Sequence, residues 1–253
     1  MCTVVLLLRP DHAWPVLLAA NRDEMLSRPW RAPGTHWPDR PGVVGGLDEL
    51  AGGSWLGINR EGVVAGILNR HGSLGPAAGR RSRGELVLEA LDHADAAAAA
   101  EALAHLDPHA YRSFNLVVAD NSRGFWLRHL GDEGPGRIEL FPLPPGYSMV
   151  TAHDRNDLAS ARIRDNLPRF ERSAVPAPER GDWSVWEGLL ASRGETAEEN
   201  EHESAMCVVT ARGFGTSSSS LIALPSRERP AVRPRWLFAA GRPGESPYLP
   251  VAL

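Results

Sequence analysis

The residues best suited to chemistry in this chain of 253 residues are Cys2 and the run Asn-Arg-Asp-Glu at residues 21–24. This polar run follows five apolar residues, 16–20, which are typical of a buried strand. A second apolar run, residues 3–8, directly follows Cys2 and predicts a partner strand. In an antiparallel hairpin the start of the first strand lies beside the end of the second, so we expect Cys2 beside the polar run.

A thiol beside a guanidinium and carboxylates could serve nucleophilic catalysis, because a nearby positive charge favours the thiolate. The same residues could instead be a buried thiol beside a structural ion pair. Side chains alternate between the faces of a strand, so Arg22 and Glu24 should point one way and Asn21 and Asp23 the other. At most one of these pairs is expected to face Cys2 unless the strand ends or bulges there.

The composition is that of an ordinary globular protein, with 23% charged and 43% hydrophobic residues and a net charge of −4. These values give no general reason to expect nucleic acid or membrane-surface binding. No apolar run approaches the roughly 18 residues of a membrane span, and the N-terminus lacks the basic region of a signal peptide. Because Cys2 and Cys207 are too few for a disulfide framework, we expect a cytoplasmic protein with free thiols, Cys207 being a core residue.

Strand-like and helix-like stretches follow one another in blocks. Residues 52–59 and 63–69 predict a second hairpin with Gly62 at its turn, and two helices should follow, one opened by a capping box of Ser82 and Glu85 and one capped by Asp95. The remaining predictions are strands at residues 114–119, 125–129, 137–141, 147–151, 205–210, 219–224 and 235–239, helices at residues 157–167 and 183–190, and a solvated acidic loop at residues 194–204.

This order of elements predicts an α+β protein, because the helices cluster apart from antiparallel strands. Roughly ten strands are many for one open sheet, so we expect two stacked antiparallel sheets. Helices on both outer faces would complete a four-layer αββα sandwich. No repeat or boundary divides the chain, and we expect a single domain over residues 1–253.

Several short motifs occur in order through the first half of the chain, and a looser one, Phe-Gly-Thr-Ser-Ser at residues 214–218, follows in the second half. Together they resemble the NRDE family, also named after transport and Golgi organisation protein 2. The first-half motifs are Met-Cys-Thr (1–3), Asn-Arg-Asp-Glu (21–24), Ser-Arg-Pro (27–29), Gly-Gly-Leu-Asp (45–48), Gly-Gly-Ser-Trp-Leu-Gly (52–57), Ser-Arg-Gly-Glu-Leu-Val (82–87) and Phe-Asn-Leu (114–116).

The resemblance implies a four-layer αββα fold like that of the N-terminal nucleophile hydrolases. The chain is also similar in pattern to the choloylglycine hydrolases and penicillin V acylases, which begin Met-Cys. In such a site, removal of Met1 would give Cys2 both a thiol and an α-amine that can act as a base near neutrality. Arg22 would favour the thiolate, and Asp23 would orient the amine.

The oxyanion of such a reaction needs hydrogen-bond donors. Asn69, at the end of its predicted strand, is one candidate donor and could equally be a strand-end cap. The relatives have a later asparagine as second donor, and His153 stands where we look for it, although a surface loop histidine is the more ordinary interpretation. Ser217 stands where the family often has an arginine.

Two functions follow from these expectations. The first is a cysteine amidohydrolase that cuts a linear C–N bond in a small acylated molecule. The alternative is a non-catalytic carrier of a hydrophobic ligand, since relatives of the transport and Golgi organisation protein are linked to haem mobilisation and lipid or acyl-CoA homeostasis. We expect no cofactor and no metal, because the histidines show no zinc spacing. The sequence indicates neither the substrate nor the oligomeric state.

Overall fold

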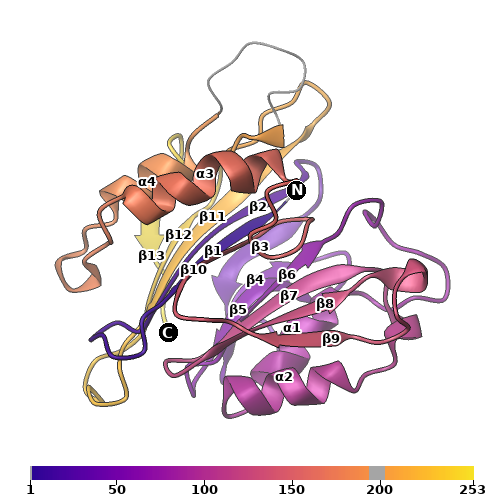
Figure 1. Cartoon of the computed structure of the whole chain (residues 1–253), viewed down its shortest axis with the longest axis horizontal. Helices are drawn as coiled ribbons and strands as arrows, with labels where there is room; N and C mark the ends of the chain where they lie inside the picture. The colour runs from indigo at the N-terminus through magenta and orange to yellow at the C-terminus, as the bar shows by residue number, and fades with distance from the viewer. Residues whose placement is uncertain (1, 194–202) are drawn as a thin grey trace.

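Two stacked antiparallel sheets lie between two pairs of helices in the computed structural model, which describes residues 2–193 and 203–253 (Figure 1). Helices α1 (Gly84–Leu91) and α2 (Ala96–Ala104) cover one sheet, and α3 (Ala161–Arg172) and α4 (Ser184–Leu190) cover the other. The predicted α+β architecture with four layers is therefore confirmed. Short 3₁₀ turns lie at Pro108–Ala110, Gly131–Glu133 and Pro178–Arg180.

The six-stranded sheet has the order β10-β1-β2-β11-β12-β13. The two apolar runs predicted to pair are adjacent in its interior, and every residue of β1 is buried. The paired central strands are therefore confirmed, as expected for runs covered on both faces. The strands are β1 (Thr3–Leu8), β2 (Val16–Met25), β10 (Gly146–Val150), β11 (Phe214–Leu224), β12 (Arg235–Ala239) and β13 (Tyr248–Pro250).

The seven-stranded sheet follows chain order from β3 to β9. The predicted hairpin with Gly62 at its turn is confirmed as β5 and β6. Gly62 has a φ of +86°, a conformation that glycine adopts without the strain a side chain would bring. The strands are β3 (Trp30–Gly34), β4 (Val43–Asp48), β5 (Ser54–Asn59), β6 (Val64–Asn69), β7 (Phe114–Ala119), β8 (Gly124–His129) and β9 (Glu139–Pro142).

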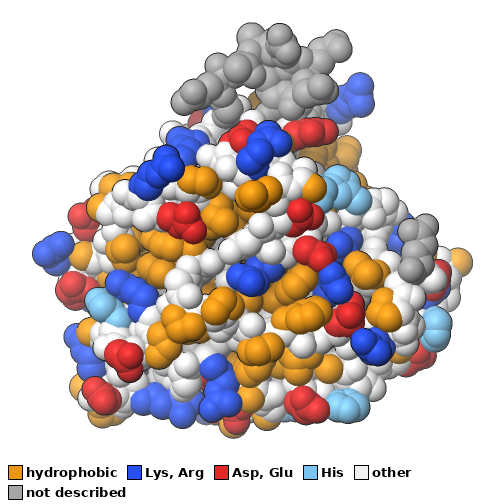
Figure 2. Space-filling view, in the orientation of Figure 1, with side chains coloured by type: hydrophobic (Ala, Val, Ile, Leu, Met, Phe, Trp, Pro, Cys, Tyr) orange, Lys and Arg blue, Asp and Glu red, His pale blue; other side chains and the backbone are white. Residues whose placement is uncertain are grey.

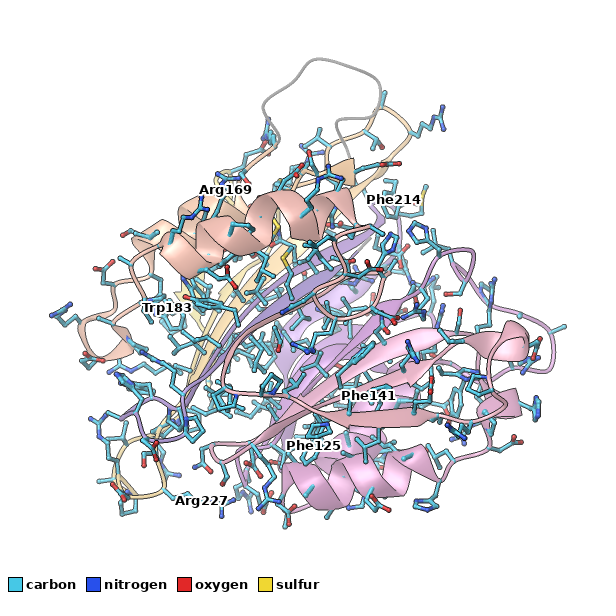
Figure 3. The ribbon with its side chains drawn as sticks, viewed as in Figure 1. Phe125, Phe141, Arg169, Trp183, Phe214 and Arg227 are labelled. Atoms are coloured by element: carbon cyan, nitrogen blue, oxygen red, sulfur yellow. The ribbon has the colours of Figure 1, made fainter. Side chains whose placement is uncertain are left out.

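Alternation along the central strands divides their side chains between two cores. Val4 and Leu18 pack between the sheets, whereas Val5 and Leu17 pack under α3 and α4 with Trp183. A third core lies between the seven-stranded sheet and α1 and α2. Figure 3 labels Trp183 on the α4 side of the molecule and Phe125 and Phe141 on the α2 side. On the face seen in Figure 2, charged side chains of both signs are interspersed with apolar ones.

Two helix starts differ from the prediction. The capping box was wrong: Ser82 Oγ accepts from the Gly84 amide at 3.2 Å, while the Glu85 carboxylate pairs with Arg81 at 2.7 Å. The first helix therefore begins at Gly84 without a side-chain cap, whereas Asp95 caps α2 as predicted.

The helix predicted at residues 157–167 instead spans Ala161–Arg172, with Ser160 as its cap. Asn156, which directly precedes the predicted helix, has a φ of +55° and hydrogen-bonds the backbone of residues 147 and 149 at the sheet edge. The helix continues through Pro168 because its last turn is held by packing: Phe170 is fully buried, 5.5 Å from the ring of Trp186.

The strand predicted at residues 205–210 was also wrong, since only an isolated bridge between Val209 and Gly215 forms there. Side-chain hydrogen bonds supplement a few backbone hydrogen bonds in this segment. The Asn21 amide donates to Met206 O at 2.9 Å, and the Val208 amide donates to Thr216 Oγ1 at 2.8 Å. Most of the loop predicted at residues 194–204 lies outside the described residues.

Candidate active site

Cys2 lies at the end of the first hairpin, beside the polar run. The strand register pairs Thr3 with Asn21, so the next pair outward is Cys2 and Arg22. The thiol donates to the carbonyl oxygen of Asp23, with 3.6 Å between the two heavy atoms. Cys2 packs against the core between the sheets, which is the face that Val4 shares.

The pKa of the Cys2 thiol is raised above its ordinary value. Burial around the sulfur is the largest cause, although the residue as a whole keeps some exposure, and the negative charge of Asp23 adds to it. The positive charge of Arg22 lowers the pKa of the thiol, as expected, but this effect is smaller than that of burial. The folded chain therefore favours the neutral thiol, and a reaction of this sulfur near neutrality needs a base to remove the proton.

Alkylation of Cys2 by iodoacetamide should accelerate with pH and reach its midpoint above about 8.5, the ordinary value for a thiol. A raised pKa keeps the thiol protonated at neutrality, so the reactive thiolate appears only at higher pH. The measurement is the labelling rate between about pH 6 and 10 on the Cys207→Ala protein, which has Cys2 as its one thiol. A midpoint below that of the same protein unfolded in urea would contradict the effect of burial.

Arg22 reaches into the space between the sheets and is 5% exposed. Its Nη1 donates to Ser217 Oγ at 3.0 Å, and its Nη2 lies 3.8 Å from Asp48 Oδ2 on the opposite sheet. The guanidinium also lies 4.5 Å from the ring centroid of Trp55. Arg22 therefore joins the two sheets beside Cys2, and Ser217, where the family often has an arginine, holds it.

The Asp23 side chain points the opposite way, toward the helices over the six-stranded sheet. Its Oδ2 accepts from Nη1 of Arg162 on α3 at 3.0 Å, and its Oδ1 accepts from Thr216 Oγ1 at 2.6 Å. Arg162 also donates to Thr3 Oγ1 at 2.9 Å, and both members of the ion pair are buried. Asp23 therefore acts on Cys2 through its charge and its backbone carbonyl, on the opposite face from Arg22 as strand alternation predicts.

The outer members of the polar run have different partners. Asn21 is fully buried and donates to the carbonyl oxygens of Leu190 and Met206, both at 2.9 Å, so it anchors the end of α4 to the sheet. Glu24 is half-buried and lies 3.8 Å from Arg28. Strand β2 thus continues through the whole polar run to Met25, five residues beyond its apolar part.

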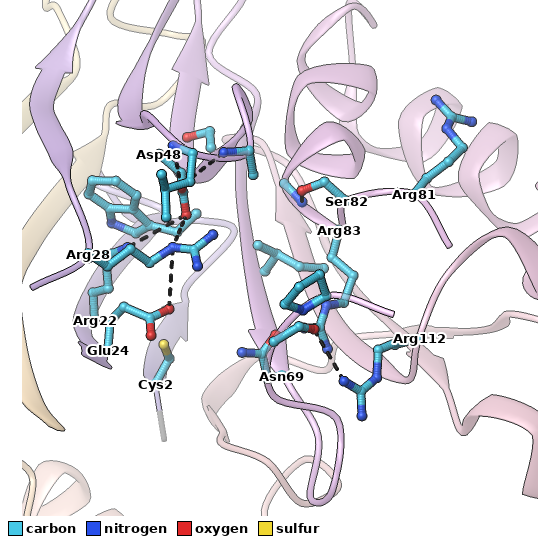
Figure 4. A pocket seen from close by; sticks show the side chains of 18 of the residues that line it. Cys2, Arg22, Glu24, Arg28, Asp48, Asn69, Arg81, Ser82, Arg83 and Arg112 are labelled. Atoms are coloured by element: carbon cyan, nitrogen blue, oxygen red, sulfur yellow. Dashed lines mark hydrogen bonds and ion pairs between the residues drawn. The ribbon is translucent and has the colours of Figure 1, made fainter. Parts of the chain in front are cut away.

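A cavity of about 410 Å³ opens beside Cys2 (Figure 4). Arg22, Asp23 and Asn69 line it together with Cys2, so it brings together four of the residues expected from the sequence. The other lining residues come from the polar run and β4–β6, from the segment before α1, and from Arg112. They are Glu24, Arg28, Asp48, Leu50, Ala51, Ser54, Trp55, Ile67, Gly75, Pro76, Ala77, Arg80, Arg81, Ser82, Arg83, Gly84 and Arg112.

Asn69 is the last residue of β6 and is half-buried at the cavity wall. Its backbone pairs with Phe114, but its side-chain amide makes no hydrogen bond to any other described residue. An amide carries two N–H donors and no charge, so Asn69 has free donors to offer a ligand in the cavity.

His153 lies elsewhere and does not line the cavity. Its Nε2 is 2.8 Å from Nε2 of His71, and its Nδ1 is 3.7 Å from Asp157. The backbone of residues 151–153 is held by Asn115, whose buried amide donates to the carbonyl oxygens of Thr151 and His153 at 2.9 and 2.7 Å. The structure therefore does not bring His153 to Cys2, and the segment that carries it is fixed on β7 instead.

Sequence reasoning missed Arg162, Thr216 and Arg83. Arg83 lies within one of the quoted motifs, residues 82–87, so the motif could have pointed to it. Thr216 lies within the looser motif at residues 214–218, but it is 193 residues from Asp23 in the chain. Arg162 is 139 residues from Asp23 and lies in no motif, so no local pattern indicated that either would meet Asp23.

The described residues contain no group of three or more His, Cys, Asp or Glu side chains that could hold a metal ion. In the same part of the chain, each helix is too short or too polar to span a bilayer.

Known structures show the same fold at low sequence identity. The chain is similar to a Caenorhabditis elegans N-acylethanolamine-hydrolyzing acid amidase orthologue (13% identity, TM-score 0.56, covering 87% of this chain and 92% of that one). It is also similar to the conjugated bile acid hydrolase of Clostridium perfringens (12% identity, TM-score 0.52, covering 100% of this chain and 97% of that one). A third similar structure is the penicillin V acylase of Agrobacterium tumefaciens (14% identity, TM-score 0.51, covering 94% of this chain and 83% of that one). These likenesses support the N-terminal nucleophile hydrolase fold.

Relatives by sequence share the first part of the chain. A Bos taurus Transport and Golgi organization protein 2 homologue is 36% identical over 154 residues, 56% of this chain and 52% of the relative. The Homo sapiens homologue is 34% identical over 145 residues, 54% and 51% of the two chains. The chain thus spans about half the length of the curated relatives it matches. The family model for Transport and Golgi organisation 2 matches residues 1–157, and the chain belongs to this family.

Proposed function

We propose that this protein, after removal of Met1, is a cysteine N-terminal nucleophile amidohydrolase that cuts linear amide bonds of a small acylated molecule. The observation that carries the proposal is the position of Cys2, at the end of a central strand and open to the cavity that Arg22, Asp23 and Asn69 also line. The names of the structural neighbours, an amidase, a hydrolase and an acylase, favour the same class of reaction.

The proposed reaction begins with proton transfer from the Cys2 thiol to its own α-amine, because the raised pKa of the thiol makes a base necessary. The sulfur then attacks the amide carbonyl, and the Asn69 amide donates to the oxygen as it becomes negative. Cleavage of the C–N bond returns the proton to the leaving amine and leaves an acyl group on sulfur. Water, deprotonated by the α-amine, hydrolyses this thioester and restores the thiol.

The alternative, a carrier of a hydrophobic ligand such as haem or a lipid, is less well supported. Six arginines line the cavity, which is a costly surrounding for a purely apolar ligand.

The two cysteines are free thiols, which suits the cytoplasmic location that we also propose.

The proposal is tested by a screen of N-acyl amides in which release of the amine is measured on protein whose intact mass shows loss of Met1. The sequence contains no lysine, so the α-amine is the one primary amine of the chain. Acetylation of this single amine, followed by hydroxylamine to free the thiols, removes its basicity and should therefore abolish hydrolysis. Full activity after complete acetylation would exclude the α-amine as the base.

Replacing Asn69 with alanine should lower kcat about 10²-fold or more with little change in KM, because the lost interaction is made to the oxyanion. Asn121→Ala is the matched control, since Asn121 bonds Pro225 and Arg227 and does not line the cavity. Steady-state kinetics of the two variants measure both kcat and KM. Equal effects of the two substitutions, or a rise in KM alone, would remove Asn69 from the proposed oxyanion site.

A further inference from the structure

The arginines that line the cavity differ in their partners. Four of them have a carboxylate within 4.0 Å: Arg22 has Asp48, Arg28 has Asp48 and Glu24, Arg80 has Asp132, and Arg81 has Glu85 and Glu89. Within the described residues, Arg83 and Arg112 have no carboxylate at that distance. These two therefore bring positive charge to the cavity that no acidic side chain beside them balances.

Neutral groups hold both of these arginines in place. Arg83 Nη1 donates to Ser73 Oγ at 2.9 Å and to the carbonyl oxygen of Ser113 at 3.0 Å. Arg112 donates to the carbonyl oxygens of residues 72, 74 and 75, at 2.6, 2.5 and 3.2 Å. Ser73 is 3% exposed and also donates to the carbonyl oxygens of Arg70 and Ser113, so the loop that holds both guanidinium groups is itself fixed.

The two guanidinium groups are close enough to affect one another. Burial lowers the pKa of Arg83 to about 10, and the positive charge of Arg112 is the second cause. A thiolate at Cys2 would raise the pKa of Arg83, and in Figure 4 Asn69 lies between Cys2 and the two arginines. A ligand within the cavity can therefore meet the arginines and Cys2 together. Two guanidinium groups fixed side by side, with the charge of Glu24 acting on Arg83 only from beyond 4.0 Å, suit an anion with several oxygen acceptors.

We propose that Arg83 and Arg112 form an anion-binding subsite that takes the carboxylate or phosphate group of an amphiphilic acyl ligand. If the proposed hydrolase function holds, this subsite restricts the substrates to acylated molecules that carry a negative charge. Neutral amides then bind more weakly because the two arginines stay unneutralised.

The test uses binding, so it does not depend on catalysis. The probes are octanoate and octyl phosphate, with neutral octanamide as the uncharged match, and affinity is measured by titration calorimetry and by protection of Cys2 from iodoacetamide. Both anions should bind more tightly than octanamide. Arg83→Gln and Arg112→Gln should each weaken anion binding about tenfold or more and leave octanamide unchanged.

Arg81→Gln is the matched control, because Arg81 lines the same cavity and already pairs with two glutamates. It should change anion affinity less than about twofold. Tighter binding of one anion assigns the subsite to carboxylate or to phosphate. Because Arg112 is bonded by loop carbonyls at the surface, its variant remains informative if Arg83→Gln does not fold. Anion affinities that do not exceed that of octanamide, or that fall equally in Arg81→Gln, would overturn the subsite while leaving the proposed hydrolase function untouched.

Discussion

Replacing Cys2 with alanine is expected to abolish amide hydrolysis and to leave the protein folded. Removal of the nucleophile from a catalytic unit costs on the order of 10⁶-fold in kcat. Loss of one thiol at a strand end should cost only about 1 kcal/mol of unfolding free energy, as is typical of single substitutions. The measurements are amine release and the urea denaturation midpoint of the same preparation.

Cys207→Ala is the control for this experiment. Cys207 is 1% exposed and packs outside the cavity, so its replacement should leave hydrolysis intact. A folded Cys2→Ala protein that still releases the amine at the wild-type rate would argue for the carrier function instead.

The second large effect is expected on stability. Asp23→Ala should lower the free energy of unfolding by about 3–5 kcal/mol, because it removes the buried carboxylate that pairs with the Arg162 guanidinium. The side chains of this pair are 0% and 1% exposed, so little water can replace the lost partner. Equilibrium urea denaturation measures the change.

Glu49→Ala provides the matched control, since Glu49 pairs with Arg31 at 2.6 Å on the surface. Loss of an exposed pair should cost no more than about 1 kcal/mol. Combining Asp23→Ala with Arg162→Met should recover part of the lost stability, because no buried charge then remains unpaired. If Asp23→Ala lowers the free energy of unfolding no more than Glu49→Ala does, the buried Asp23–Arg162 pair does not stabilise the fold more than a surface pair.

The fold was largely predictable because its strongest signals are local. The apolar runs of β1 and β2, the turn at Gly62 and the cap Asp95 each depend on neighbours within a few residues. At the end of α3, where the prediction failed, a contact from outside the helix decided the structure. Packing of Phe170 on Trp186 extends α3 through Pro168, although the proline by itself indicates an end.

The site was predictable only in part, for the same reason. Hairpin geometry was enough to bring Cys2 beside Arg22 and Asp23. It could not indicate that β2 continues beyond Ala20, because burial of this polar run depends on partners 139 to 198 residues away in the chain, among them Arg162 and Ser219. The two arginines of the proposed anion-binding subsite come from the residue before α1 and from the segment before β7, which no periodic pattern brings together.

The measurement that tests the central claim most directly is the intact mass of the protein before and after brief incubation with an N-acyl p-nitroanilide, quenched in acid. The proposed mechanism predicts a starting mass that lacks Met1 and, after incubation, an added acyl group on the peptide that begins with Cys2. Retention of Met1 in active protein, or an acyl adduct that digestion places on a residue other than Cys2, would contradict it.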